Sequence, residues 1–201
     1  MRPVGTGGQK RGAPQLLLLP TGAGQPVALT HDSIAHVFAT FLPDGKRFLF
    51  GGSEPGRASR NWVQDVTGGK PLSITPEGTV GKCVSPDSKM LVAADGERKF
   101  WLYPIDGGQP RALSGIRPEE ETIRWSADGK DLFVANYDVI PAKVYRIEVS
   151  TGRRQLLYNL APSDATGLWN VSPIILTPDG KSYVYSDYRI LSDLYVASGL
   201  K

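Results

Sequence analysis

The sequence predicts an all-β fold made of repeated sheets, on three observations. A turn of the Pro-Asp-Gly-Lys type occurs four times, with its Asp at positions 44, 87, 128 and 179. The steps between these positions are 43, 41 and 51 residues, close to the ~40–45 residues of one four-stranded blade. A short apolar run follows each turn, and no segment between the turns keeps the period of a helix. We therefore expect an all-β β-propeller with four recognisable four-stranded blades plus a partial N-terminal blade.

The first unit, residues 36–74, shows every part of the expected blade. Its strands are His36–Phe41, Phe48–Phe50, Trp62–Val66 and Leu72–Ile74. The turn between the first two strands contains Pro43, Asp44 and Gly45. Proline fixes φ at the first turn position, Asp can bond back to its own backbone, and Gly supplies a positive φ. The second strand is apolar without alternation, as expected for a strand that neighbouring sheets cover on both faces.

Three further units repeat this order over residues 80–113, 121–158 and 170–201. Their expected strands are Lys82–Ser85, Met90–Ala94, Phe100–Ile105, Arg111–Leu113, Thr122–Trp125, Leu132–Ala135, Val144–Val149, Gln155–Leu157, Val171–Leu176, Tyr183–Tyr185 and Leu194–Ala197. Ser88 replaces the turn glycine in the second unit and Ala127 replaces the proline in the third, so these turns should be less favourable. Residues 14–30 have the pattern of the last two strands of a partial blade. Residues 1–13 have that of a disordered lead-in.

The strand count leaves two arrangements open. Val27–Leu29 could supply the outer strand that the fourth unit lacks, which would close a four-bladed ring and leave Leu16–Leu19 unused. We favour the alternative, in which the chain forms an arc of a larger propeller of about six or seven blades.

Composition and charge argue against several function classes. The chain has 23 Lys and Arg against 20 Asp and Glu, a net charge of +3, with the basic residues scattered singly or in pairs. No basic stripe could follow a phosphate backbone, so we expect no nucleic-acid partner. Leu16–Leu19, the longest run of one apolar residue type, is too short for a membrane segment or a secretory signal. The single cysteine, Cys83, lies in an apolar strand and should be a buried, unreactive thiol.

Three local patterns resemble catalytic or metal-binding motifs, and we interpret each as structural. Gly180-Lys181-Ser182 lacks the first glycine of a P-loop and is followed by no helix. Gly51–Pro55 has proline where a nucleophile elbow has its second glycine. His31 and His36, even with Asp32, lack the spacing of a metal site. We therefore expect no metal and no cofactor.

The second unit carries the clearest family resemblance. It combines the turn Ser85-Pro86-Asp87-Ser88-Lys89 with an aromatic strand, Phe100-Trp101-Leu102-Tyr103, and the turn Asp106-Gly107-Gly108. With its copies over residues 14–201, this pattern resembles the TolB-like, WD-repeat-like propellers of bacteria. The resemblance implies a propeller fold, and a TolB-like periplasmic protein-interaction scaffold is one functional alternative.

The C-terminal residues resemble a narrower group. Residues 177–186, Leu191–Val196 and Gly199–Lys201 are similar to the end of bacterial receptor-type serine/threonine protein kinases, in which a cytoplasmic kinase is followed by a membrane segment and a sensor propeller. The sequence contains no Gly-rich phosphate loop, no Val-Ala-Ile-Lys strand, no His-Arg-Asp loop and no Asp-Phe-Gly. We therefore expect a non-catalytic binding or sensor propeller, a fragment or relative of such a sensing region, and no enzyme activity.

The compartment depends on this resemblance. With no signal peptide as written, a stand-alone protein would be cytoplasmic, whereas the sensing region of a receptor kinase would be extracytoplasmic. A propeller module associated with a prolyl-oligopeptidase-type hydrolase is a further alternative.

Loops on a rigid scaffold carry function, and propellers bind through the loops at one end of the channel. Here these loops are residues 30–35, 75–80, 114–122 and 159–169, together with 51–60, 95–98, 137–142 and 187–190. The expected partner is a protein or a small-molecule ligand on this loop face. The candidate ligand-binding residues are Arg57, Arg60, Arg98, Glu120, Tyr137, Trp169 and Tyr188. The acidic run Glu119–Glu121 is expected to be a solvated loop, and Trp62, Trp101 and Trp125 are expected to pack between blades.

Overall fold

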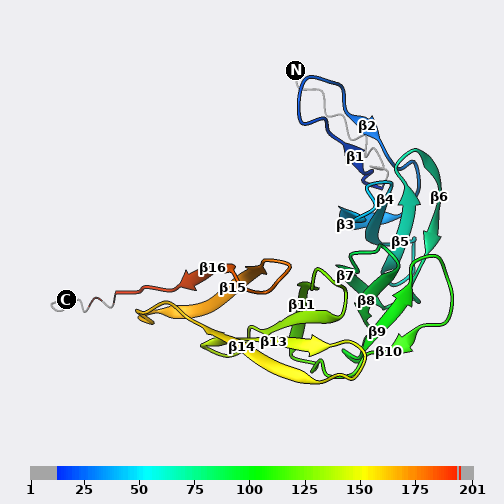
Figure 1. The fold of residues 1–201 in the computed structure, drawn as a ribbon. Coiled ribbons are helices and arrows are strands. Elements are labelled where there is room, and N and C mark those ends of the chain that lie inside the picture. Colours follow the sequence, from blue (N-terminus) through cyan, green and yellow to red (C-terminus); the bar gives the residue numbers. More distant parts are fainter. Residues whose placement is uncertain (1–12, 194, 196–201) are drawn as a thin grey trace, which may run out of the picture. The chain divides into compact units, whose positions relative to one another are not determined.

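The computed structural model describes residues 13–193 and residue 195. Over these residues the chain forms sixteen strands, β1 to β16, and no helix (Figure 1). The prediction of an all-β fold is therefore confirmed. No helix long and apolar enough to cross a membrane occurs in this part of the chain. Three predictions fall outside the described residues: the lead-in up to residue 12, most of the strand Leu194–Ala197, and the C-terminal Gly199–Lys201.

The chain divides into two compact units, residues 1–112 and 113–201. In the first unit, β1 (Leu17–Leu18) and β2 (Val27–Ala28) form a two-stranded sheet. Two four-stranded sheets follow, with the strands β3 (Ala35–Phe41), β4 (Arg47–Ser53), β5 (Arg60–Asp65), β6 (Gly68–Ser73), β7 (Val80–Val84), β8 (Met90–Ala94), β9 (Phe100–Pro104) and β10 (Arg111–Ala112). Consecutive strands of each sheet are antiparallel neighbours, as a propeller blade requires.

The second unit contains one complete four-stranded sheet and one two-stranded sheet. The strands are β11 (Glu120–Trp125), β12 (Asp131–Asn136), β13 (Ala142–Glu148) and β14 (Arg154–Leu160), followed by β15 (Leu168–Leu176) and β16 (Tyr183–Arg189). β15 and β16 pair antiparallel with two register shifts, one between Leu168 and Asn170 and one between Val171 and Ile174.

The second strand of each complete blade is covered on both faces. In β4, Leu49 is fully buried and packs in one cluster with Leu91 of β8. Its neighbours Phe48 and Phe50 point to the opposite face, where they pack with Trp62 of β5. Alternate residues of one strand thus enter two different cores, which explains why these strands lack an alternating pattern.

In the second unit, one apolar core joins the two sheets. Phe133 of β12 and Val144 of β13 pack in it with Val171 and Ile174 of β15. β16 differs from the other second strands, because Val184 is 61% exposed.

The repeated turn is held by a hydrogen-bond pattern that its sequence explains. In the second of the four repeated turns, the Ser85 hydroxyl donates to Asp87 Oδ1 over 2.6 Å and accepts from the Met90 amide over 2.9 Å. The Asp87 carboxylate also accepts from the Lys89 amide over 3.1 Å. The same three bonds recur at Ser126, Asp128, Lys130 and Asp131, and at Thr177, Asp179, Lys181 and Ser182. A hydroxyl residue two positions before the Asp therefore belongs to the motif in three of the four turns, and the first turn has Leu42 at this position.

The substitution at position 88 has the consequence that the sequence predicts. Gly45, Gly129 and Gly180 have φ of 67°, 69° and 69° in the other three turns, and Ser88 adopts φ of 60° at the equivalent place. This conformation disfavours a residue with a Cβ atom. A compensating contact exists, because the Ser88 hydroxyl accepts a 2.9 Å hydrogen bond from the Asp44 amide of the neighbouring turn. In the second compact unit, residues 113–201, a similar hydrogen bond joins two neighbouring turns: the Ala127 amide donates to the Pro178 carbonyl over 3.0 Å.

The carboxylates of these turns lead us to expect that the free energy of unfolding decreases at acid pH. Hydrogen bonds from Ser85, Ser126 and Thr177 hold the pKa of Asp87, Asp128 and Asp179 below its usual value. A lowered native pKa stabilises the fold above the pKa of the unfolded chain, about 3.9, and this contribution is lost as the pH falls through the native values. We expect the urea midpoint to be insensitive to these groups between about pH 5 and 7 and to fall below about pH 4.

The matched variant is the triple substitution Asp87→Asn, Asp128→Asn and Asp179→Asn, since asparagine retains the acceptor oxygen without titrating. Its midpoint should fall less steeply than that of the unmodified chain over the same acid range. Parallel curves for the two proteins would contradict the assignment.

A buried asparagine joins the two complete sheets of the first unit. Asn61 of β5 is 0% exposed. Its Nδ2 donates to the Gly81 carbonyl over 2.8 Å, and its Oδ1 accepts from the Gly81 amide over 2.7 Å. A Cβ atom at position 81 would lie 2.0 Å from the Val92 carbonyl oxygen. Glycine is therefore required at position 81, because a side chain there would clash with the neighbouring strand β8.

Candidate functional site

Two of the predicted residues, Arg57 and Arg60, are brought together in the first unit. Arg57 Nη1 and Arg60 Nη2 each lie 2.8 Å from Glu77 Oε1, and Arg60 Nη2 lies 3.1 Å from Glu54 Oε2. The hydrogen bond from Arg57 lowers the pKa of Glu77. Two guanidinium groups thus face two carboxylates, and this loop cluster has no net charge.

Arg98 lies in the tight turn between β8 and β9, where it adopts φ of 61°. The same turn is held by Asp95, which accepts hydrogen bonds from the Trp101 ring nitrogen over 2.9 Å and from the Lys99 amide over 3.0 Å. The Trp101 bond is the main cause of the lowered pKa of Asp95. Trp101 is partly buried and packs against the core that contains Leu49 and Leu91 of two blades, so the prediction that it packs between blades is confirmed.

Glu120 departs from the solvated loop that the sequence predicts. It begins strand β11 and is 1% exposed, whereas Glu119 and Glu121 are exposed. Its Oε2 accepts from Arg154 Nη1 over 2.8 Å and from the Arg117 amide over 2.9 Å. The prediction of a solvated position is wrong for Glu120, because the strand begins two residues earlier than expected and turns this side chain inward.

The three predicted aromatic residues have different surroundings. Tyr137 packs against the core of the second unit, and burial raises its pKa. Trp169 of β15 is 66% exposed and Tyr188 of β16 is 55% exposed. Both lie on the β15–β16 pair, where Tyr188 is the register partner of Asn170. Both side chains are exposed, and their role in ligand binding stays a prediction.

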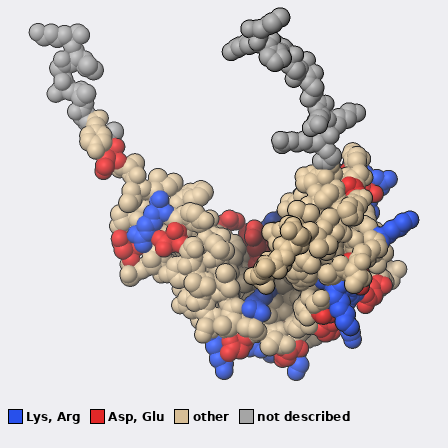
Figure 2. Space-filling view, turned by 90° about the horizontal axis from the view of Figure 1, so that it is seen from above, with Lys and Arg blue, Asp and Glu red and all other residues tan. Residues whose placement is uncertain are grey.

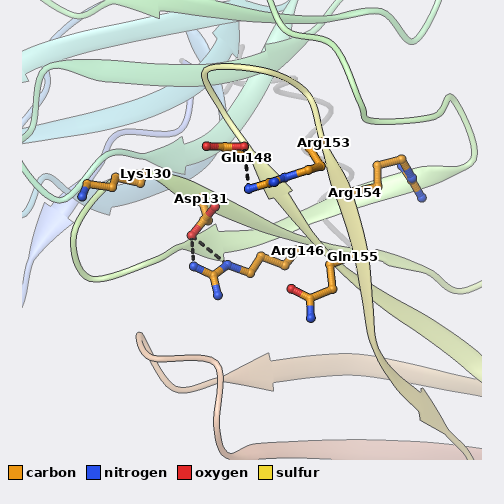
Figure 3. A pocket seen from close by; sticks show the side chains of 7 residues that line it. All are labelled: Lys130, Asp131, Arg146, Glu148, Arg153, Arg154 and Gln155. Atoms are coloured by element: carbon orange, nitrogen blue, oxygen red, sulfur yellow. Dashed lines mark hydrogen bonds and ion pairs between the residues drawn. The ribbon is translucent and has the colours of Figure 1, made fainter.

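The sequence analysis did not predict a hollow at the end of the β11–β14 sheet where its short turns lie. It has a volume of about 510 Å³, and we call it the Arg146 hollow (Figure 3). Its lining residues are Lys130, Asp131, Arg146, Glu148, Arg153, Arg154 and Gln155. They come from the start of β12, the end of β13 and the start of β14, where the two short turns of this blade lie. The predicted loop 137–142 lies at the other end of the same strands, whereas Gly115 and Glu120 of the predicted loop 114–122 contact the lining residue Arg154.

The ion pairs of the Arg146 hollow are oriented with their positive ends outward. Arg146 Nε donates to Asp131 Oδ2 over 2.7 Å, and Arg153 Nη2 lies 3.2 Å from Glu148 Oε2 (Figure 3). The Arg146 side chain is 48% exposed against 7% for Asp131, and Arg153 is 79% exposed against 32% for Glu148. Hydrogen bonding to Asp131 raises the pKa of Arg146. The accessible lining is therefore mainly cationic.

Arg154, the remaining arginine of the lining, is held in place by contacts with Glu120, Gly115 and Tyr145. It donates to both carboxylate oxygens of Glu120 and to the Gly115 carbonyl, and its guanidinium lies 4.2 Å from the centre of the Tyr145 ring. The Glu120 bond is the main cause of its raised pKa. In sequence, only the pair Arg153-Arg154 beside a turn could have indicated this site.

Elsewhere the charges of the two signs are interspersed. On the face shown in Figure 2, basic and acidic side chains lie next to one another. No group of three or more His, Cys, Asp or Glu that could hold a metal occurs in the described part of the chain. His36 Nε2 lies 3.1 Å from Asp32 Oδ1, and the ring is buried.

Comparison with solved structures supports the propeller fold. TolB from Acinetobacter baumannii matches with a TM-score of 0.63 at 18% identity, over 88% of this chain and 49% of that chain. A TolB-like protein from Agrobacterium tumefaciens matches with a TM-score of 0.59 at 18% identity, over 84% of this chain and 61% of that chain. An oligogalacturonate lyase in complex with manganese matches with a TM-score of 0.58 at 16% identity, over 90% of this chain and 68% of that chain.

No family model matches the sequence, and no curated protein matches it either. The chain spans about half to two thirds of the length of the solved structures named above. At these identities the similarity concerns the fold alone. The fold is that of a TolB-like β-propeller.

Proposed function

We propose that this chain is a non-catalytic binding propeller that recognises an anionic, carboxylate-bearing ligand at the Arg146 hollow. The observation that supports the proposal is the orientation of the ion pairs there. Their guanidinium groups are exposed, while Asp131 and Glu148 lie deeper. An incoming anion would therefore meet hydrogen-bond donors before it meets a negative charge.

The donors are suited to a carboxylate. A guanidinium carries five N–H groups in a fixed planar fork, and Arg146 uses its Nε and Nη2 on a single oxygen of Asp131. Its remaining donors and those of Arg153 can bind a carboxylate through charge-assisted bonds. Gln155 adds a neutral side chain that can donate or accept beside them.

The sensor role is the finer part of this proposal. The likeness of residues 177–186 and Leu191–Val196 to the end of receptor-type kinases supports it, and the exposed Trp169 and Tyr188 offer a second contact surface on the same unit. The coding sequence on either side of this chain tests it. A kinase with a membrane segment upstream supports the sensor role, and a downstream α/β-hydrolase favours the hydrolase-associated alternative.

Ligand binding is tested with fluorescein-labelled hexaglutamate, and hexaglutamine serves as the neutral control peptide. We expect hexaglutamate alone to bind, with an affinity that falls as salt is added. Arg146→Gln should weaken binding about tenfold, since it removes a charge-assisted hydrogen bond. Arg153→Gln, at a more exposed position, should weaken binding without affecting the fold.

Arg111→Gln is the matched control, because Arg111 is exposed on β10 of the first unit. It should leave hexaglutamate binding unchanged. Equal losses in all three variants would reduce the effect to net charge and contradict the proposed site. Phosphotransfer or hydrolysis that persists through purification would contradict the non-catalytic part of the proposal.

A further inference from the structure

A second hollow lies in the first unit, and its chemistry differs from that of the Arg146 hollow. It has a volume of about 460 Å³ and is lined by residues of β2, β5 and β6 and by the segments that follow β2 and β5. Val27, Leu29 and Val66 form apolar parts of the wall, and Asp32, Gln64 and Lys70 form polar parts. We call it the Gln64 hollow.

Gln64 is the residue that makes this hollow a candidate site. The residue is 6% exposed. Its Nε2 donates to the Leu29 carbonyl over 3.2 Å and to the Gly69 carbonyl over 2.9 Å. Both amide protons are therefore used, and the two carbonyls fix which end of the amide is the nitrogen. The other end, Oε1, is buried and has no hydrogen-bond partner among the described residues.

A buried acceptor without a partner is unfavourable, and native structures seldom keep one. A ligand that donates an N–H or O–H group would remove this deficit at Gln64. The bond would form beside apolar walls, where a hydrogen bond is stronger than in water.

The surroundings favour a polypeptide as the donor. The Gln64 amide bridges Leu29, next to β2, and Gly69 of β6, so the backbones of two outer strands lie close to it. Among the described residues β2 pairs only with β1 and β6 only with β5. Free strand edges bind extended peptides through main-chain groups, and apolar walls between them accept side chains. We propose that the Gln64 hollow binds an extended segment of a partner protein, whose backbone N–H donates to Gln64 Oε1. This site is independent of the Arg146 hollow.

The test uses two capped tripeptides on the isotope-labelled full chain. The first is acetyl-Ala-Val-Ala-N-methylamide, and the second is the same peptide with every amide nitrogen methylated, so that it has no N–H donor. We expect the first to shift the side-chain amide signals of Gln64 and the backbone amide signals of Leu29 and Gly69. The N-methylated peptide should bind at least tenfold more weakly.

Two tryptophan variants separate this site from non-specific binding. Ala28→Trp fills the hollow from an exposed position on β2 and should abolish the shifts. Ala112→Trp, at an exposed position on the outer strand β10, should leave them intact. Gln64→Leu removes the acceptor and should also abolish binding, and its backbone spectrum shows whether the fold is kept.

Three outcomes would overturn the proposal. Equal affinity of the two peptides would show that no N–H donor is read. Unchanged Gln64 signals at saturating peptide would show that the hollow does not bind polypeptide. Shifts at Gln64 with ethanolamine but with neither peptide would make it a small-molecule site instead.

Discussion

Replacing Glu120 by alanine should lower the free energy of unfolding by about 3–5 kcal/mol, the cost of removing one partner of a buried ion pair. The Arg154 side chain is 21% exposed, and Glu120 is 1% exposed. Without Glu120, the Arg117 amide would lose its acceptor, and the Arg154 guanidinium would lose its carboxylate partner while it keeps the Gly115 carbonyl. Urea unfolding followed by tryptophan fluorescence measures the effect, and Trp125 lies on the same strand as Glu120.

Two further variants make the test specific. Glu119→Ala changes an exposed carboxylate in the same acidic run and should alter stability by no more than about 0.5 kcal/mol. The double variant Glu120→Leu with Arg154→Leu should recover most of the loss, because replacing a buried ion pair by apolar residues is often neutral. A double variant as unstable as Glu120→Ala would contradict the ion-pair explanation.

Asn61→Ala should cost about 2–4 kcal/mol, since it leaves both the amide and the carbonyl of Gly81 without their partner. Asn61→Asp keeps an acceptor for the Gly81 amide but buries a carboxylate against the Gly81 carbonyl, so it should cost at least as much as Asn61→Ala. The loss is measured by urea unfolding with tryptophan fluorescence, and faster hydrogen exchange at the Gly81 amide localises it.

Asn159→Ala is the control, because Asn159 is exposed on β14. It should change stability by no more than about 0.5 kcal/mol. If Asn61→Ala were equally mild, the two hydrogen bonds to Gly81 would not be important for joining the sheets.

The fold could be predicted because its signals are local. A turn that needs a positive φ at one position selects Gly45, Gly129 and Gly180, and the exception at Ser88 is visible from the sequence alone. Strands covered on both faces have continuous apolar runs, as in β4 and β12. The burial of Trp62 and Trp125, at 8% and 5% exposure, and of Cys83 follows from their positions in such strands.

The candidate sites depend on contacts between residues far apart in sequence, which no local pattern encodes. Nothing in the run Glu119–Glu121 shows which glutamate turns inward, because that depends on where β11 begins and on an arginine 34 residues away. The Arg146 hollow depends on the register of β12 with β13, in which Asp131 faces Glu148 and lies within reach of Arg146. Gln64 is likewise a site candidate only because β2 packs beside it.

The hydrogen bonds that join neighbouring turns also limit how a blade can move. The Asp44 amide donates to the Ser88 hydroxyl in the first compact unit, and the Ala127 amide donates to the Pro178 carbonyl in the second. Both hydrogen bonds lie at the end of the sheets where the repeated Asp-containing turns are, opposite the long loops. A sheet that tilts when a partner binds would therefore pivot about its turn end, and the largest displacement would occur at the loops on the far side.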